Sequence, residues 1–170
     1  MRLYPGKIPA IAEDIIHRLR QEGDLEVGNL HEARLDVEAV LKEYLSMDRE
    51  LTERAKDLME RRGLPYGHFA RIKRTLCEER NFAIGDEAVP YLANQLVEVF
   101  MRSPNIDEVF ADDVSLRKKL QALLRKHMQL EEELDQEVRR RIKNLEEGTS
   151  AWDIEYQRIM AEVKRKHKLE

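Results

Sequence analysis

The apolar residues of this chain recur mostly every three or four positions, which is the spacing of amphipathic helices. Three such stretches follow one another in the first half, at about residues 5–22, 29–62 and 66–80. The second would be about 50 Å long at the helical rise of about 1.5 Å per residue, so it needs a helical partner to bury its apolar positions. The first has a single apolar face made by Ile8, Ile11, Ala12, Ile15, Ile16 and Leu19.

Residues that start or end helices separate these stretches. Asn29 followed by Glu32 is typical of a capping box at a helix start, and Gly63 with Pro65 is typical of a helix end. Between the first two helices, Leu25-Glu26-Val27 alternates in polarity, which fits either a very short strand or a linker.

The second half of the chain repeats this pattern. With a shift of 81 positions Ile8-Pro9 aligns with Val89-Pro90, and with a shift of 83 Asn29 aligns with Asp112. Any two amphipathic helices align at their leucines, because apolar positions recur regularly in both. The proline pair, the helix starts and the glycine breaks also recur in the same order, so we predict an internal duplication.

The predicted fold is therefore all-α, a helical bundle of two tandem three-helix repeats, residues 1–81 and 82–170. We expect the long central helices, at about 29–62 and 113–146, to pack antiparallel, since the loops are short enough for helical hairpins.

Each repeat also has room for a minor short strand, the second at Ile106–Val109. The last helix is expected to begin at Ser150, with Asp153 completing a second capping box.

Composition narrows the functional classes. Of 170 residues 38% are charged and 42% hydrophobic, and the formal net charge is −4, which argues against a dedicated nucleic-acid binder. The single cysteine, Cys77, excludes an intramolecular disulfide and a cysteine-based zinc site. The first residues lack the apolar run of a signal peptide, and no stretch approaches the ~18 apolar residues of a membrane-spanning helix. We therefore expect a cytoplasmic protein.

Spacing gives little support for metal binding. Glu13 and His17 lie four positions apart, as do His127 and Glu131, so each pair shares a helix face. Di-metal helical bundles need Glu-x-x-His pairs and zinc proteases need His-Glu-x-x-His, and both patterns are absent. His127 aligns with Tyr44, so we interpret it as a partly buried residue between helices. No metal or cofactor is expected.

Motifs for covalent catalysis are also missing. No serine lies in a Gly-x-Ser-x-Gly turn, and Cys77 is followed by Glu78 and Glu79, which disfavour a reactive thiolate. A small apolar role for the cysteine is the favoured interpretation. We expect a protein that is not an enzyme.

Two groups of residues are candidates for interaction. Basic runs lie near helix C-termini, where they suit the helix dipole as solvated ends; alternatively, they bind nucleic acid or an anionic membrane surface. They occupy residues 71–74, 139–143 and 164–168, and the candidate residues are Arg139, Arg140 and Arg141. Trp152 and Tyr156 lie four apart on one helix face, a candidate binding face whose more common alternative is core packing.

Several segments resemble the bacterial family catalogued as domain of unknown function 507. They are the opening Met1-Arg2-Leu3, the segment Asp24-Leu25-Glu26-Val27, and most distinctively Gly148-Thr149-Ser150-Ala151-Trp152-Asp153-Ile154-Glu155-Tyr156. The resemblance implies that some members are single units of about half this length, which fits the duplication. In the first repeat Leu64-Pro65-Tyr66-Gly67 replaces the Trp-Asp-x-x-Tyr segment, so any role of that motif belongs to the second repeat. The resemblance implies no activity.

The leading functional hypothesis is a non-enzymatic helical scaffold or adaptor that binds a protein partner or a second copy of itself. The alternative hypothesis is weak nucleic-acid binding through the basic helix ends. A third, an enzyme with an unrecognised metal site, has no motif in its favour.

Overall fold

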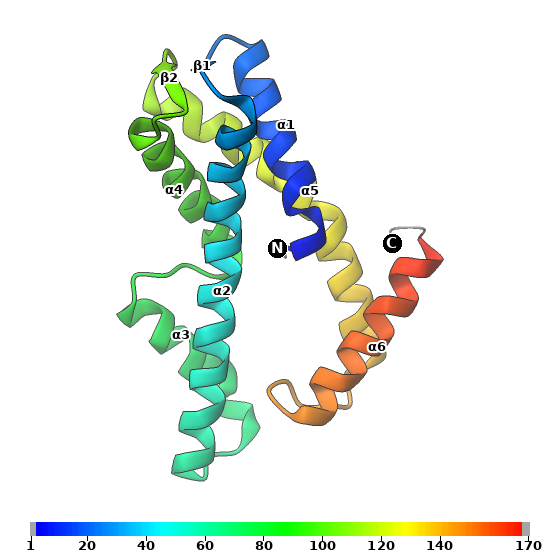
Figure 1. Cartoon of the computed structure of the whole chain (residues 1–170). Coiled ribbons are helices and arrows are strands. Elements are labelled where there is room, and N and C mark those ends of the chain that lie inside the picture. The colour runs from blue at the N-terminus through cyan, green and yellow to red at the C-terminus, as the bar shows by residue number, and fades with distance from the viewer. Residues whose placement is uncertain (1–2, 168–170) are drawn as a thin grey trace. The chain divides into compact units, whose positions relative to one another are not determined.

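The computed structural model describes residues 3–167, and within them all side chains except those of Leu130 and Glu131. This part of the chain is mostly helical, as predicted, with six α-helices and one two-stranded antiparallel sheet (Figure 1). A short 3-10 helix directly precedes α1, α3 and α4. The elements are α1 (Ile8–Gln21), β1 (Leu25–Val27), α2 (Leu30–Arg62), α3 (Phe69–Glu79), α4 (Ala88–Arg102), β2 (Ile106–Val109), α5 (Asp113–Arg141) and α6 (Ser150–Lys166).

Side-chain caps fix the starts of three helices. The Oδ1 atom of Asn29 accepts a hydrogen bond of 3.1 Å from the backbone N–H of Glu32, which confirms the predicted start of α2. Asp112 caps α5 in the same way, through Ser115 N–H at 2.9 Å. The cap of α6 was predicted one residue too late, because Thr149 Oγ1 accepts the Trp152 N–H at 3.1 Å.

The end of α5 was also predicted too late. The helix stops at Arg141 rather than near residue 146, and the chain turns with a 2.9 Å hydrogen bond from Leu145 N–H to the Ile142 carbonyl. Gly148 follows with φ +94°, a left-handed conformation that ends this connection.

The chain folds into two compact units, and neither is continuous in sequence. Unit 1 comprises Leu3–Met47 and Gly85–Gln129, and unit 2 comprises Asp48–Ile84 and residues 130–167. Helices α2 and α5 each contribute residues to both units. Each unit therefore contains parts of both predicted repeats. The duplication itself remains a prediction.

The sheet of unit 1 joins β1 to β2. Leu25 lies opposite Val109 and Val27 opposite Ile106, with an irregularity after Glu26. Backbone hydrogen bonds continue the pairing on both sides, from Phe110 N–H to the Asp24 carbonyl (2.8 Å) and from Gly28 N–H to the Asn105 carbonyl (2.9 Å). Both predicted short strands are therefore present, and they pair with each other.

Helices α1 and α4 lead into this sheet and α2 and α5 leave it (Figure 1). Contacts show that α2 and α4 run antiparallel. Asp36, near the start of α2, accepts hydrogen bonds from Ser103 and Asn105 beyond the end of α4, and Tyr44 lies beside Tyr91 near the start of α4.

The helices α1 and α5 form the corresponding antiparallel pair. Lys119, near the start of α5, donates to Asp24 at 2.6 Å, just before β1. His127, further along α5, contacts Asp14 of α1 at 2.6 Å, further from the sheet. The prediction that the two long helices are antiparallel partners is wrong for unit 1. Strand pairing places the starts of both helices at the same end, so the antiparallel neighbours are α4 and α1.

Apolar side chains from all four helices fill the core of unit 1. Such burial is the main favourable contribution to folding, at about 25 cal/mol per Å² of apolar surface. Fully buried members include Ile8, Ile11, Ile15, Ile16, Leu19, Leu41, Leu92, Leu96, Phe100 and Leu116. The predicted apolar face of α1 is therefore confirmed as a core face.

Unit 2 packs the second half of α2, α3, the second half of α5, and α6. Ion pairs link neighbouring helices, from Lys73 to Asp48 at 2.8 Å and from Lys56 to Asp153 at 2.6 Å. Its buried side chains include Leu51, Ala55, Met59, Phe69, Leu76, Leu134, Val138, Trp152, Tyr156, Ile159 and Val163.

Gly148 is a test of this packing. A Cβ atom there would lie 3.1 Å from Cδ2 of the buried Phe69, and the residue has φ +94°. We expect Gly148→Ala to lower the free energy of unfolding by about 2 kcal/mol, from both strain and crowding. Gly63→Ala should lower the free energy of unfolding by only about 1 kcal/mol, because Gly63 has φ +60° but open surroundings.

Gly67→Ala is the matched control, since it has neither a positive φ nor a neighbouring atom within 4 Å. Urea unfolding followed by circular dichroism measures all three variants. Equal losses for Gly63→Ala and Gly148→Ala would show that Phe69 does not constrain this position.

Candidate functional site

The predicted binding face at Trp152 and Tyr156 lies in the core of unit 2. Trp152 is 7% exposed and Tyr156 2% exposed, and the two rings stack with centroids 4.9 Å apart and an interplanar angle of 22°. Core packing, the alternative given above, therefore describes these side chains, and they present no aromatic face to a partner.

Arg139 from α5 covers this pair. Its guanidinium lies 5.1 Å from the centroid of the Trp152 ring, and its Nε and Nη1 atoms pair with Asp135 and Glu147, each at 2.9 Å. The Tyr156 hydroxyl donates to Asp135 as well. Burial opposes the charge on Arg139, but the two carboxylates outweigh it and raise the pKa of the guanidinium. We call these five residues the arginine–aromatic cluster.

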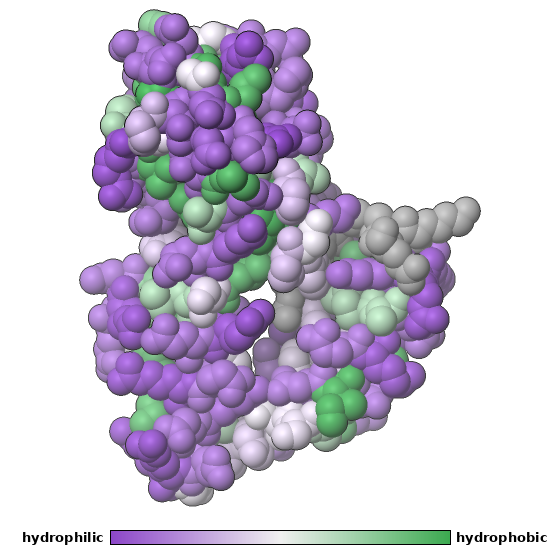
Figure 2. Space-filling view, in the orientation of Figure 1, coloured by the Kyte–Doolittle hydropathy of each residue, from purple (hydrophilic) through white to green (hydrophobic). Residues whose placement is uncertain are grey.

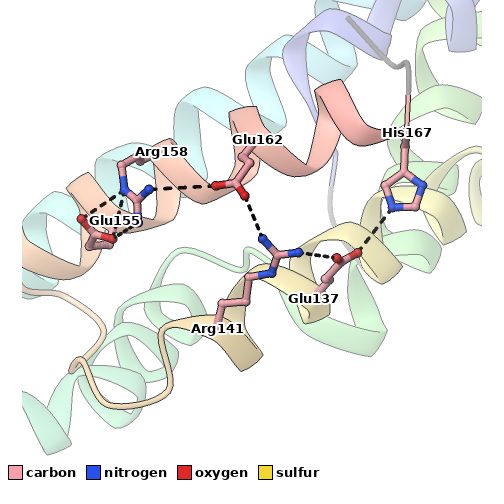
Figure 3. A network of polar contacts seen from close by, with 6 residues as sticks. All are labelled: Glu137, Arg141, Glu155, Arg158, Glu162 and His167. Carbon is pink, nitrogen blue, oxygen red and sulfur yellow. Dashed lines mark hydrogen bonds and ion pairs between the residues drawn. The ribbon is translucent and has the colours of Figure 1, made fainter.

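Arg141 lies in a surface network of alternating charges, shown in Figure 3. Its Nη2 atom is 3.1 Å from Glu137 and its Nη1 atom 3.4 Å from Glu162. Arg140 donates from Nε to the Gln136 carbonyl at 3.4 Å. Within residues 3–167, Arg140 alone of the three candidate arginines pairs with no carboxylate, so much of the positive charge of this run is neutralised.

The structure gives ionic or hydrogen-bonding partners to two of the residues considered for metal binding. His127 pairs with Asp14, and Glu13 with Arg34 at 3.8 Å. The side chain of Glu131 lies outside the described residues. Across the described part of the chain, no three His, Cys, Asp or Glu side chains are grouped to hold a metal ion.

No helix within residues 3–167 has both the length and the apolar character needed to cross a membrane.

Cys77 is buried in unit 2, on α3. Burial raises the pKa of its thiol, and Lys73 nearby only partly offsets that effect. A protonated, buried thiol is a poor nucleophile, which fits the small apolar role expected from the sequence.

The more suggestive surface lies in unit 1, in a groove of about 410 Å³ between α2 and α4. Two half-buried tyrosines, Tyr44 and Tyr91, lie at one end with ring centroids 6.0 Å apart. Figure 2 shows hydrophobic surface in the region that these helices occupy, surrounded by hydrophilic residues. We call this the α2–α4 groove; it is lined by Asp36, Ala39, Val40, Glu43, Tyr44, Tyr91, Leu92, Gln95, Val99 and Arg102.

Glu43 lines the tyrosine end of the groove, and its side chain is exposed. Burial, followed by the nearby carboxylates of Glu43 and Glu98, raises the pKa of Tyr91. Among the described residues neither glutamate forms an ion pair, whereas Asp36 at the far end accepts hydrogen bonds from Ser103 and Asn105.

A second cavity, of about 750 Å³, lies on the other flank of α4, against the first turns of α5. Arg102 lines both hollows. In the second one Arg117 has a buried Nε atom with no hydrogen-bond partner among the described residues, and its Nη2 atom is 3.6 Å from Asp113. The lining mixes two guanidinium groups with the carboxylates of Glu98 and Asp113, so it selects no single charge.

This surface was not predicted from the sequence. Tyr44 was noted there only as the residue aligned with His127, and Tyr91, Glu43 and Glu98 were not candidates. The available signal was a difference between the repeats, because the predicted alignment sets Tyr91 against Ala10.

Comparison with known proteins identifies a family. A family model described as "Protein of unknown function (DUF507)" matches residues 1–169. No curated protein matches the chain.

The arginine–aromatic cluster makes a prediction about stability. Tyr156→Phe removes the hydrogen bond to Asp135 but keeps the ring stack, so we expect a loss of about 1 kcal/mol in the free energy of unfolding. Arg139→Leu leaves Asp135 and Glu147 without their cation and should lose about 2 kcal/mol.

Arg140→Leu, one position along α5 and exposed, is the control and should change stability by less than about 0.5 kcal/mol. Chemical denaturation measures all three. If Arg139→Leu were as mild as the control, the cluster would not hold α5 to α6.

Proposed function

The chain belongs to the DUF507 family, whose description names no activity, and we propose a function for it from the geometry of unit 1. The protein is a non-enzymatic helical adaptor of the cytoplasm that binds a helical segment of a protein partner in the α2–α4 groove. The observation that carries this proposal is the tyrosine-lined hollow between two antiparallel helices.

The composition of the groove supports a protein ligand. Tyrosines are enriched among the interface residues that contribute most to binding free energy, because they supply a large apolar area together with a polar hydroxyl. Between them and the far end, Val40, Leu92 and Val99 provide apolar contact. A groove between two helices that is apolar along its length and polar at its edges is the kind of site in which an amphipathic helix binds.

The corresponding face between α1 and α5 also supports it. At the positions that the predicted alignment equates, Asp36 corresponds to Lys119 and Tyr44 to His127. Lys119 bridges Glu22 and Asp24, and His127 contacts Asp14, so polar contacts link the two helices along that face. The α2–α4 face has the two tyrosines and Glu43, which forms no ion pair among the described residues, and this difference is expected where one face has acquired a ligand.

We expect the adaptor role to depend on the groove. Replacing both Tyr44 and Tyr91 by alanine should reduce capture of a partner from cell extract at least about tenfold, as for loss of interface aromatic residues. Ala39→Trp, at an exposed position that lines the groove, should block it without removing any buried side chain. Quantitative affinity purification with mass spectrometry measures the captured proteins.

The matched control is Phe110→Ala, which removes a 63% exposed aromatic ring of unit 1 outside the groove. It should leave capture unchanged, and circular dichroism checks that each variant is folded. The proposal fails if every captured protein binds all four forms equally, or if none is captured and the protein remains a monomer on sizing.

The alternative, nucleic-acid binding through the basic helix ends, has less support because carboxylates neutralise Arg139 and Arg141. We expect no tight binding to short RNA or duplex DNA at moderate salt. Arg140→Gln with Lys143→Gln should change the measured affinity by less than about twofold. Fluorescence anisotropy at several salt concentrations is the measurement. A steep fall of affinity with salt that the substitutions reduce would favour nucleic acid instead.

A further inference from the structure

We infer that a second copy of this chain binds at the cavity between α4 and the start of α5, and that the two copies form a dimer with twofold symmetry. The guanidinium groups of Arg102 and Arg117 on each copy pair with the carboxylates of Glu98 and Asp113 on the other. This surface shares only Arg102 with the α2–α4 groove, so the inference goes beyond the adaptor role.

The charged groups that line this cavity are poorly paired within one chain. Glu98 and Arg102 have the four-residue spacing of a helical ion pair, yet Arg102 Nε donates to the Glu98 backbone carbonyl at 3.3 Å. Neither side chain forms an ion pair among the described residues. Arg117 has a buried Nε atom without a hydrogen-bond partner there, and its Nη2 atom is 3.6 Å from Asp113 of its own helix. Charged groups of another molecule would complete these contacts, and an unpaired buried donor makes such completion favourable.

The corresponding flank between α1 and α2 is closed by an ion pair. Arg34 of α2 lies 3.8 Å from Glu13 of α1, which links the two helices. The predicted alignment equates these two residues with Arg117 and Asn94. Asparagine carries no charge, and the described residues contain no ion pair between α4 and α5. Arg117 is therefore left without the partner that its counterpart has.

Exposed apolar side chains accompany these charges. Met101, which lines the cavity, is 54% exposed. Val114 is 60% exposed and lies one helical turn before Arg117 on α5. Methionine and arginine are both enriched at interfaces between proteins, where apolar contact supplies much of the affinity. This surface therefore has the composition of a protein interface.

The balance of charge determines the kind of partner. Two guanidinium groups and two carboxylates line the cavity, so a uniformly acidic or uniformly basic partner would meet like charges there. In a dimer with twofold symmetry the same surface occurs on both sides, and each contact between two different residues occurs twice. A surface that carries both signs is complementary to itself when arginines face carboxylates. A second copy of the chain therefore supplies the charges that this surface lacks.

The association state of the full chain is the first test. We expect sedimentation equilibrium to show a monomer–dimer equilibrium that depends on protein concentration. Met101→Glu with Val114→Glu places like charges in the contact and should weaken dimerisation at least about tenfold. Tyr66→Glu with Ile154→Glu is the matched control, because it changes two exposed apolar residues of unit 2, and it should change the dissociation constant less than about twofold.

Exchange of charges is the second test, and only pairing between two copies passes it. Arg102→Glu with Arg117→Glu leaves only carboxylates among the charged groups of the cavity, and Glu98→Lys with Asp113→Lys leaves only cations. We expect each variant alone to be a monomer, because like charges repel, and an equimolar mixture to form a heterodimer. Sedimentation of the mixture with one variant fluorescently labelled measures the heterodimer, and circular dichroism checks that each variant is folded.

The control for charge exchange lies on the other flank. Arg20→Glu with Arg34→Glu makes the same change of charge on α1 and α2. It should leave the dimer intact and should not form a heterodimer with the lysine variant in preference to its own dimer.

Each result decides for or against the inference. It is overturned if the chain is a monomer at every concentration up to about 0.5 mM, if the control pairs weaken the dimer as much as the cavity pairs, or if the mixed variants are folded but remain monomers. Tyr44→Ala with Tyr91→Ala should leave the dimer unchanged, so the dimer and the adaptor role fail separately. A dimer lost in that variant would place the second copy in the α2–α4 groove and contradict the surface proposed here.

Discussion

The pairing of two very short strands determines how unit 1 is built. Leu25–Val27 and Ile106–Val109 are far apart in sequence, and neither strand has another neighbour in the described sheet. Their antiparallel register brings together the two points at which the chain reverses between helices. The helices before the strands must then approach this end and the helices after it must leave, so α2 lies against α4, and α1 against α5.

The two pairs of helices brought together in this way differ in chemistry. On the α1–α5 side, Lys119 of α5 reaches the carboxylates of Glu22 and Asp24 just after α1, and His127 contacts Asp14 of α1, so polar contacts bridge the two helices. Exposed pairs of this kind contribute little to stability, typically less than about 1 kcal/mol each, but they cover the apolar surface beneath them. On the α2–α4 side, tyrosine rings and an aspartate with neutral partners leave a hollow.

Local sequence signals predicted the local structure well. Asn29 with Glu32 located the start of α2, Gly63 located its end, and the spacing of Ile8 to Leu19 identified a core face. These features depend on residues within a few positions of one another. The partner of each long helix could not be found in this way, because Leu25 and Val109 choose each other only in three dimensions, and that choice reverses the expected packing of α2 and α5.

The candidate site was harder to predict for a related reason. The spacing of Trp152 and Tyr156 on one helix face allowed either a binding face or core packing, and the structure buries both rings in unit 2 beside Arg139 and Asp135. Tyr44 and Tyr91 are far apart in sequence, and only the antiparallel packing of α2 on α4 makes them neighbours. A comparison between the two predicted repeats contained the signal, but its meaning depended on knowing which helices face each other.

The composition of unit 1 from both halves of the chain has a consequence for any polypeptide that carries only one of them. Residues 3–47 alone hold two of the four helices and one strand whose hydrogen-bonding edge has no neighbour. Such a fragment exposes half a core and an unpaired edge, which together favour association with a complementary copy. In this chain the complementary half is covalently attached, so an assembly that two separate molecules would form only at sufficient concentration becomes intramolecular and independent of concentration.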